Sequence, residues 1–409
     1  MRKDRLGNLG LPLLKILSSQ KEHTHGNFKK INIKVISEVT FEPLDKIIAF
    51  FLADYGLLPV FDVGNYDQLN YEIFNIKESK SDNAELIYIH NSTLKFFTKA
   101  SGLQRKSTTE VFQSLIEEYL KNLHDFANSV EKSPLILNLF ELPPYRIRGS
   151  HSTRSGIIKT IGWANTQILS LCAENKNVLI HDINYISASV GLTNWYDFGA
   201  WAAFKQPFSG LALKNFGLSI SSVIASYLGK SKKILITDFD DTLWGGVVGD
   251  VGAEGLKIGS NSPQGEIFSL VQSYLYDLMD SGIILAASSK NEESNVKPAF
   301  EQLSSHLQID DFASAKINWS LKSSNIAEIL NDLNIGDDSA VFIDDNPAEI
   351  LEVSSSLPEC SCISYEAIAI EMVQSIDASG FFEMQSISSD DLTRNQSYRE
   401  NANRNEILK

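Results

Sequence analysis

Three aspartates directly follow an apolar segment in the second half of the chain. The segment 233–237 reads KILIT, and Asp238, Asp240 and Asp241 come next. A buried parallel strand delivers side chains in this way to the carboxyl edge of a sheet. If the extended backbone persists, Asp238 and Asp240 point to the same side, roughly 6–7 Å apart along the backbone. One carboxylate can then attack while the other transfers a proton, although such a pair taken alone is also typical of a solvated turn or a cap.

Two later segments contain groups that can hold an anion. The apolar strand predicted within Gly282–Asn291 ends in SSKN, which places Ser288 and Ser289 at its end. Hydroxyls and freed backbone N–H groups at such a position can bind an anion. Lys322 stands just before a predicted helix and can place an ammonium on the same anion. The structural alternatives are that the SSKN polar groups cap the following helix and that Lys322 is solvated.

A third strand ends in a further acidic pair. The segment Val341–Glu349 reads VFIDDNPAE, so Asp344 and Asp345 lie where the strand ends ahead of Pro347. Carboxylates at strand ends are typical ligands of a hard cation such as Mg²⁺. Because complementary groups recur at the ends of three strands, the sequence favours phosphoryl transfer over the separate structural interpretations.

In order and residue type, these motifs resemble the haloacid dehalogenase (HAD) superfamily of phosphotransferases. The pattern DFDDTLWGGVVGDVGAEGLKIG is followed by SSKN, by NW ahead of Lys322, and by IDDNPAE. It is similar to subfamily IIIC, the FkbH-like phosphatases. The resemblance covers about residues 28–400 and is sharpest from Lys233 onward.

The resemblance implies a catalytic role for four residues. Asp238 would be the nucleophile that forms an aspartyl-phosphate, and Asp240 would protonate the leaving group and then activate water. Ser289 and Lys322 would hold the phosphoryl oxygens. The implied activity is that of a HAD-like hydrolase, specifically a phosphatase.

The resemblance also implies a bound Mg²⁺. Its ligands would be the Asp238 carboxylate, the main-chain carbonyl of Asp240 and Asp345, with Asp344 beside them. Which of Asp344 and Asp345 contacts the metal directly is left open. A phosphoryl group and an aspartate repel each other, and a divalent cation together with an ammonium offsets that repulsion.

The spacing of the motifs leaves little chain for a covering domain. About 45 residues separate the first two strands, and a helix predicted at about Gln264–Ser281 uses many of them. A short, glycine-rich flap remains at Trp244–Ser262, and the chain between the second and third motifs is also too short for an independent domain. We therefore predict an open site without a large cap, which suits a bulky substrate or a partner that completes it. Trp244 either packs under the flap or contacts the substrate, and packing is favoured.

Length and patterning predict two α/β domains, at residues 1–230 and 231–409. A chain of 409 residues with 43% hydrophobic residues can bury more than one core. Each domain is expected to be a parallel sheet flanked by helices. The resemblance implies that the second, with a helical tail, is HAD-like and Rossmannoid. Before the motifs, strands are predicted near Ile31–Ile36, Leu57–Val63, Leu86–His90, Pro134–Leu139 and Val178–Asp182. The boundary is expected near Gly229–Lys232, where GKSKK follows a helix.

The first domain resembles the SGNH-hydrolase fold, of the flavodoxin-like α/β type, without its catalytic pattern. Ser37 follows the first strand, but ISEVTF lacks the glycine-aspartate-serine turn. The later segment HDINYISASVGL contains His181 and Asp182 but no DxxH pattern. We interpret these three residues as ordinary strand-end residues and the domain as a non-hydrolytic binding or docking platform.

The net charge of -15 argues against nucleic acid or an anionic membrane as the main partner. No apolar run approaches a membrane span. Three cysteines, Cys172, Cys360 and Cys362, are few and odd in number, which is typical of a reducing cytoplasm. We therefore expect a cytoplasmic protein.

One segment is basic, although the chain as a whole is acidic. The run PPYRIRGSHSTRSGIIK, at 143–159, brings together Arg146, Arg148, His151 and Arg154. It either contacts an anionic substrate or partner, or is a solvated loop that enters the next helix.

Taken together, the sequence predicts a Mg²⁺-dependent phosphohydrolase acting on a phosphate ester or acyl phosphate. The resemblance implies a place in polysaccharide or secondary-metabolite biosynthesis. The FkbH-like resemblance adds an alternative, a glyceryl transferase that loads an acyl carrier protein from bisphosphoglycerate. Two features differ from many relatives: Ser288 stands where they have a cysteine, and longer relatives continue into an acetyltransferase-like domain. The third alternative is an inactive scaffold. The expected partner is a phosphorylated small molecule or a carrier-bound substrate.

Overall fold

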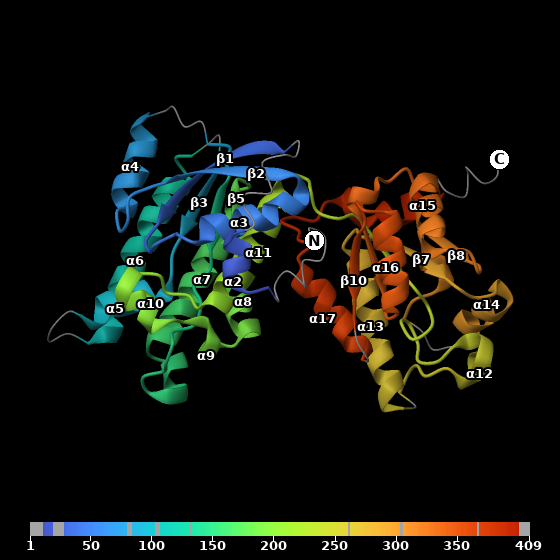
Figure 1. Ribbon diagram of the computed structural model, residues 1–409. Helices are drawn as coiled ribbons and strands as arrows, with labels where there is room; N and C mark the ends of the chain where they lie inside the picture. The colour runs from blue at the N-terminus through green and yellow to red at the C-terminus, as the bar shows by residue number, and fades with distance from the viewer. Residues whose placement is uncertain are drawn as a thin grey trace. The chain divides into compact units, whose positions relative to one another are not determined.

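The computed structural model describes residues 11–18, 28–79, 84–102, 107–130, 133–260, 262–302, 306–365 and 368–400. Contacts within the chain separate Leu11–Ala225 from the part that begins at Ser226. Each of these two units is built on its own five-stranded parallel sheet with flanking helices (Figure 1). The predicted fold class, α/β with parallel sheets in both halves, is confirmed.

The first five strands along the chain form the sheet of the first unit, and the next five form the sheet of the second unit. Those of the first unit are β1 (Lys29–Ser37), β2 (Leu57–Val63), β3 (Leu86–His90), β4 (Leu135–Asn138) and β5 (Val178–His181). Those of the second unit are β6 (Ile234–Thr237), β7 (Ile284–Ser289), β8 (Ser314–Ile317), β9 (Ala340–Asp344) and β10 (Ser361–Ser364).

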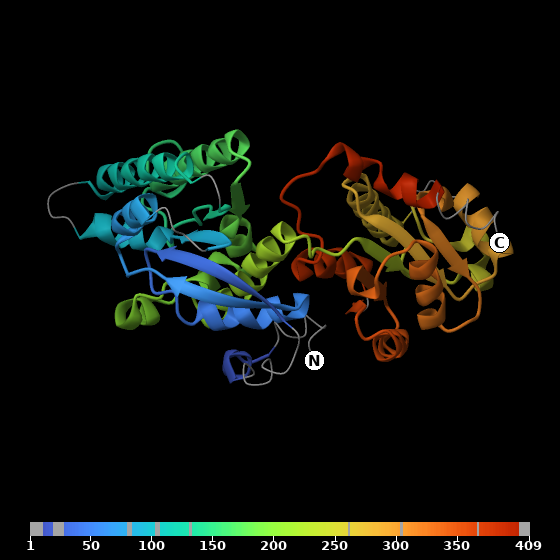
Figure 2. The ribbon, with the colours of Figure 1, turned by 90° about the horizontal axis from the view of Figure 1, so that it is seen from above.

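The first sheet has the strand order β2-β1-β3-β4-β5, the flavodoxin-like order of doubly wound proteins. One face packs against α3 and α11 and the other against α4–α7 (Figure 2). Every residue of β3 and β4 is buried, as expected for parallel strands covered on both faces. The helices are α2 (Leu13–Ser18), α3 (Leu44–Leu52), α4 (Leu69–Ser79), α5 (Thr93–Ser101), α6 (Thr108–Ala127), α7 (Ile157–Glu174), α8 (Ile183–Val190), α9 (Leu192–Trp195), α10 (Phe198–Phe204) and α11 (Gly210–Tyr227).

Two histidines are fully buried where β3 and β5 meet α11. The His90 ring packs edge-on against Phe216 at 5.2 Å between centroids, and the His181 ring does so at 4.8 Å. One nitrogen of each ring contacts a hydroxyl, Tyr88 for His90 and Ser219 for His181, and the other nitrogen has no hydrogen-bond partner among the described residues. Burial lowers the pKa of each imidazole to about 3, and the neighbouring His90 adds to the effect on His181.

The first unit is therefore expected to loosen in mild acid. Between pH 6.5 and about 3, each histidine binds a proton only after unfolding, so the free energy of unfolding falls by about 1.4 kcal/mol per histidine for each unit by which the pH is lowered. Burial and Asp67 raise the pKa of Glu38 to about 7, which opposes this trend between pH 7 and 4.5. Hydrogen exchange of β3 and β5 should therefore depend less on pH in His90→Gln than in wild type. The exposed His124→Gln is the control, and equal slopes in all three proteins would contradict the prediction.

The second sheet has the strand order β10-β9-β6-β7-β8. The chain passes from β6 to β7 and β8 on one side, then crosses to β9 and β10 on the other, so the topological switch point lies between β6 and β9. Helices α13, α14 and α17 cover one face of the sheet, and α15 and α16 cover the other. The helices are α12 (Val248–Gly255), α13 (Pro263–Asp280), α14 (Glu293–Gln302), α15 (Lys322–Asp332), α16 (Pro347–Ser356), α17 (Ala369–Ser379) and α18 (Ser389–Leu392).

Within the described residues of the second unit, no domain is inserted between the strands, which agrees with the predicted absence of a large cap. The flap contains α12, a short helix that the sequence analysis did not predict. Its sequence is rich in glycine, which disfavours helices and so gives no helical pattern, and Gly252, at φ 67°, breaks its helical geometry. Trp244 is fully buried, with its ring 5.1 Å from Phe300, so the packing role favoured for it is confirmed.

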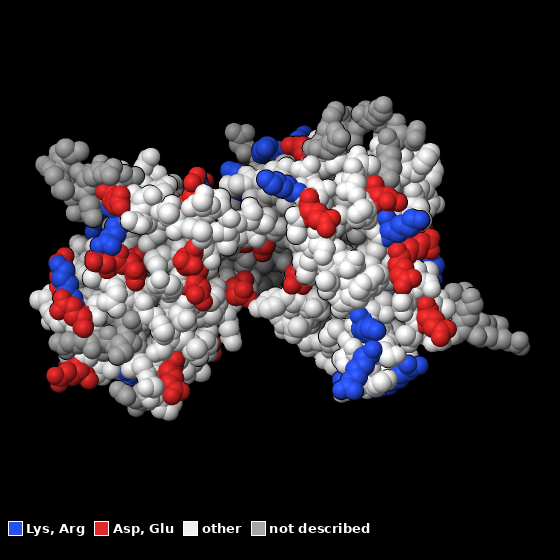
Figure 3. Space-filling view, turned by 180° about the vertical axis from the view of Figure 1, so that it is seen from behind, with Lys and Arg blue, Asp and Glu red and all other residues white. Residues whose placement is uncertain are grey.

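No helix in the described part of the chain combines the length and the apolar character needed to cross a bilayer. On the face drawn in Figure 3, acidic and basic side chains are interspersed with uncharged ones, with no broad basic patch on that face.

Candidate active site

The switch point of the second sheet brings two acidic strand ends together. Asp238 directly follows β6, and Asp344 is the last residue of β9, whose neighbour Ile343 pairs with Thr237. Both strands are buried along their whole length, so the side chains that leave their carboxyl ends converge in the crevice where α/β proteins bind ligands.

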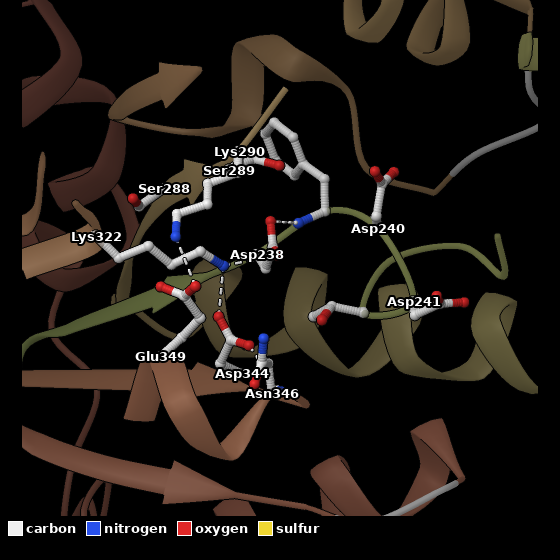
Figure 4. A network of polar contacts seen from close by, with 12 residues as sticks. Asp238, Asp240, Asp241, Ser288, Ser289, Lys290, Lys322, Asp344, Asn346 and Glu349 are labelled. Carbon is white, nitrogen blue, oxygen red and sulfur yellow. Dashed lines mark hydrogen bonds and ion pairs between the residues drawn. The ribbon is translucent and has the colours of Figure 1, made fainter. Parts of the chain in front are cut away.

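Lys322 lies between these two carboxylates (Figure 4). It is the first residue of α15, and its Nζ is 2.7 Å from Asp238 Oδ2 and 2.5 Å from Asp344 Oδ2. The side chains of Lys322 and Asp344 are 2% and 1% exposed, against 15% for Asp238. Asp238 is therefore the member of this group that an incoming molecule can reach.

The site contains more negative than positive charge. Burial alone would lower the pKa of Lys322, but the charges of Asp238 and Asp344 outweigh it and raise that pKa. Burial raises the pKa of Asp344 to about 6, and Asp238 adds to the rise while Lys322 opposes it. Both shifts favour protonated groups, as expected where several carboxylates surround one ammonium.

Asp240 is held by three hydrogen bonds on the flap side. Its Oδ1 accepts from Trp244 Nε1 at 2.8 Å and from the Val248 backbone N–H at 3.2 Å, and its Oδ2 accepts from Asn291 Nδ2 at 2.8 Å. Partial burial raises the pKa of Asp240, and Asp238 contributes to the rise. A carboxyl that keeps its proton more readily than usual suits a general acid.

Ser289 is the last residue of β7 and is 1% exposed. Its Oγ accepts from Asn291 Nδ2 at 3.1 Å, so Asn291 joins the SSKN segment to Asp240. The preceding Ser288 is fully buried, and its Oγ accepts from Asn325 Nδ2 at 3.4 Å. Of the two serines, Ser289 is the one connected to the acidic residues.

The other two acidic residues differ from each other in role. Asp345 follows β9 and is exposed, and partial loss of hydration together with the charges of Asp238 and Asp241 raises its pKa. Asp241 has a left-handed backbone, with φ 51°, and its Oδ1 accepts from the Gly246 N–H at 2.8 Å. Asp241 therefore orders the turn after β6.

The donor atoms and charges of this edge fit a hard divalent cation. Burial raises the pKa of Asp240, Asp344 and Asp345, and the charge of Asp238 adds to each rise, so the charged forms of these carboxyls are disfavoured. A cation among carboxylate and carbonyl oxygens would relieve that repulsion, and these are the ligands that Mg²⁺ prefers. In the described part of the chain, no three acidic, histidine or cysteine side chains are already gathered as a ready metal site.

One ion pair at the site was not predicted from the sequence. Lys290 Nζ is 2.6 Å from Glu349 Oε1, and the two side chains are 33% and 14% exposed. Lys290 was recognised only as part of SSKN, and Glu349 only as part of IDDNPAE. Their separation of 59 positions gives no local signal that they pair.

In the first unit, the strand-end residues considered for hydrolysis have separate partners. Ser37 Oγ donates to the Val39 carbonyl at 2.6 Å, and His181 Nε2 contacts Ser219 Oγ at 3.2 Å. Asp182 caps α8 by accepting from the Tyr185 N–H. Their contacts are those of ordinary strand-end residues.

The basic segment lies on the surface of the first unit. Arg146, His151 and Arg154 are exposed, while Arg148 borders a shallow cavity of about 250 Å³ that Lys159 and Trp163 also line. The cavity lies at the beginnings of α6 and α7. The segment is thus partly loop and partly the wall of a cavity.

No protein-family model matches the chain, and no curated protein is significantly similar to it in sequence. Among solved structures, it is similar to the crystal structure of the N-terminal part of the protein BF1531 from Bacteroides fragilis, which contains a phosphatase domain and is complexed with Mg. The sequences are 25% identical, the TM-score is 0.84, and the match covers 92% of this chain and 100% of that one. The similarity supports a phosphatase-type hydrolase with two Rossmann-like α/β units.

Proposed function

We propose that this chain is a Mg²⁺-dependent phosphohydrolase of the HAD type, in the FkbH-like subfamily IIIC, that acts through an aspartyl-phosphate. The observation that carries the proposal is the pairing of Asp238, at the switch point, with the buried ammonium of Lys322 at 2.7 Å. An accessible carboxylate beside a buried cation is an arrangement suited to attack on a phosphoryl group. The similarity to a phosphatase domain supports the same reaction class.

The proposed reaction has two steps. An Asp238 oxygen attacks phosphorus, and the bond from phosphorus to the leaving oxygen breaks while Asp240 gives that oxygen its proton. Asp240, now ionised, takes a proton from water, which attacks the phosphorus of the aspartyl-phosphate. The bond between phosphorus and Asp238 then breaks, and free phosphate and the original carboxylate are restored. Lys322 and Ser289 hold the phosphoryl oxygens in both steps.

Mg²⁺ would be held by the Asp238 carboxylate, the main-chain carbonyl of Asp240 and Asp345. Asp344 is already engaged by Lys322, and its Oδ1 accepts from the Asn346 N–H at 2.8 Å. Asp344 would thus orient the ammonium and Asp345 would face the ion. When bound, the ion supplies positive charge that offsets the repulsion between substrate and carboxylates.

Loading of an acyl carrier protein stays a prediction. Ser288 has a buried hydroxyl where a thioester would need a thiol. Cys172 lies in α7 of the first unit, and Cys360 and Cys362 lie just before and within β10, which β9 and β6 separate from β7 in the second sheet. If the chain transfers an acyl group, the thiol that accepts it would belong to the carrier.

The proposed function predicts phosphate release that depends on Mg²⁺. We would measure it with acyl phosphates, sugar phosphates and bisphosphoglycerate, each with Mg²⁺ and with EDTA. Release on at least one of these substrates, lost with EDTA and restored by excess Mg²⁺, is the expected result. Equal release with and without EDTA would contradict the proposal.

A further inference from the structure

We infer that Lys290 is a specificity-determining residue that binds a second anionic group of the substrate. Glu349 forms an ion pair with the Lys290 ammonium until that anionic group of the substrate replaces it. The inference rests on the proposed function and names its substrate class: phosphate compounds with a carboxylate or second phosphate close to the phosphoryl group that reacts.

The Lys290–Glu349 pair joins elements that lie on either side of the strand that carries the nucleophile. Lys290 directly follows β7, and Glu349 lies in the first turn of α16, which follows β9. In the sheet, β6 lies between β7 and β9. An ion pair that joins residues just after these two flanking strands therefore crosses the end of β6, where Asp238 lies.

Lys290, which is drawn with Glu349 and Lys322 in Figure 4, is the more exposed of the two lysines at this site. Lys322 is 2% exposed and already contacts two carboxylates. Lys290 is 33% exposed, and within the described residues its ammonium contacts only Glu349. An ammonium has three donors, so Lys290 can turn to a new acceptor at the site entrance.

Transferring the Lys290 ammonium from Glu349 to a substrate anion costs little free energy, because the Glu349 carboxylate remains stabilised by its position in α16. Glu349 lies in the first turn of α16, where the helix dipole stabilises a carboxylate. A partly exposed ion pair also costs less to separate than a fully buried one. A substrate with an anionic end gains a charged hydrogen bond from the exchange, and a substrate with an apolar end gains nothing. A charged hydrogen bond of this kind corresponds to about 10- to 100-fold in kcat/KM.

Three phosphate esters with the same two-carbon skeleton test the inference with Mg²⁺ present. Ethyl phosphate ends in a methyl group, phosphoglycolate in a carboxylate, and ethylene glycol bisphosphate in a second phosphate. Wild type should prefer one or both anionic substrates over ethyl phosphate by about tenfold or more in kcat/KM. Lys290→Met should remove that preference through KM and leave kcat/KM for ethyl phosphate within about twofold.

The two partners of the ion pair should act in opposite directions. Glu349→Gln frees Lys290 and should lower KM for the preferred anionic substrate, whereas Lys290→Met should raise it. If the pair is only a structural bridge, both variants should impair all three substrates alike. Lys297→Met is the matched control, because Lys297 forms an exposed pair with Glu293 on α14 at 2.8 Å.

The possible results separate the inference from the proposed function. Hydrolysis of all three substrates at similar kcat/KM by wild type would overturn the role of Lys290 and leave the phosphatase intact. Parallel losses in Lys290→Met and Glu349→Gln would do the same. Failure of wild type to hydrolyse any phosphate compound would overturn the proposed function, and the inference with it.

Discussion

Asp238→Asn is expected to lower phosphate release by about 10³-fold or more, because an amide cannot replace the attacking carboxylate. The change keeps the size of the side chain. Lys322 retains its contact with Asp344, so the buried cation does not lose its whole environment. Phosphate release should be measured at saturating Mg²⁺, so that weaker metal binding does not account for the loss.

Asp280→Asn is the control for Asp238→Asn. Asp280 is an exposed aspartate at the end of α13 in the same unit, away from the strand ends. It should keep wild-type activity. A folded Asp238→Asn variant with near wild-type activity would place the nucleophile elsewhere.

Lys322→Met is expected to abolish activity and also to destabilise the second unit. Met matches the length of lysine but leaves Asp344, at 1% exposure, without its ammonium. Removing one partner from a buried ion pair costs about 3–5 kcal/mol. Chemical denaturation should therefore show a lower midpoint for the transition of this unit, in addition to the loss of phosphate release.

A second substitution separates the two effects of Lys322→Met. Adding Asp344→Asn removes the unpaired charge, so stability should partly return while activity stays absent. If the double variant is no more stable than Lys322→Met, the destabilisation comes from the lost contacts of Lys322 itself, such as the cation–π contact of its Nζ with the Phe342 ring at 5.8 Å, and not from the unpaired carboxylate of Asp344.

The buried strands of both sheets were predictable, because a parallel strand covered on both faces is a short continuous apolar run. The strand β6 reads ILIT and β9 reads AVFID, and both are entirely buried. The edge strands β8 and β10 were not predicted. They read SAKI and SCIS, and several of their residues are only partly buried, so their patterns contain too few apolar residues to indicate strands.

In the site, the residues at strand ends were predictable and the contacts that position them were not. Asp238, Ser289 and Asp344 could be found because each ends an apolar run. The hydrogen bond from Trp244 to Asp240 could not, since nothing in the spacing says that a buried indole also donates to the carboxyl. The Lys290–Glu349 pair depends on the order of strands in the sheet, which the sequence does not state.

The most direct test of the central claim is the mass of the protein quenched in acid during turnover. Asp240→Asn should be used with an acyl phosphate, whose good leaving group permits the first step while the second step lacks its base. The account predicts the added mass of one phosphoryl group, located on Asp238 by peptide mapping and absent from the Asp238→Asn/Asp240→Asn double variant. Phosphate release without any adduct, or an adduct on another residue, would contradict the aspartyl-phosphate mechanism.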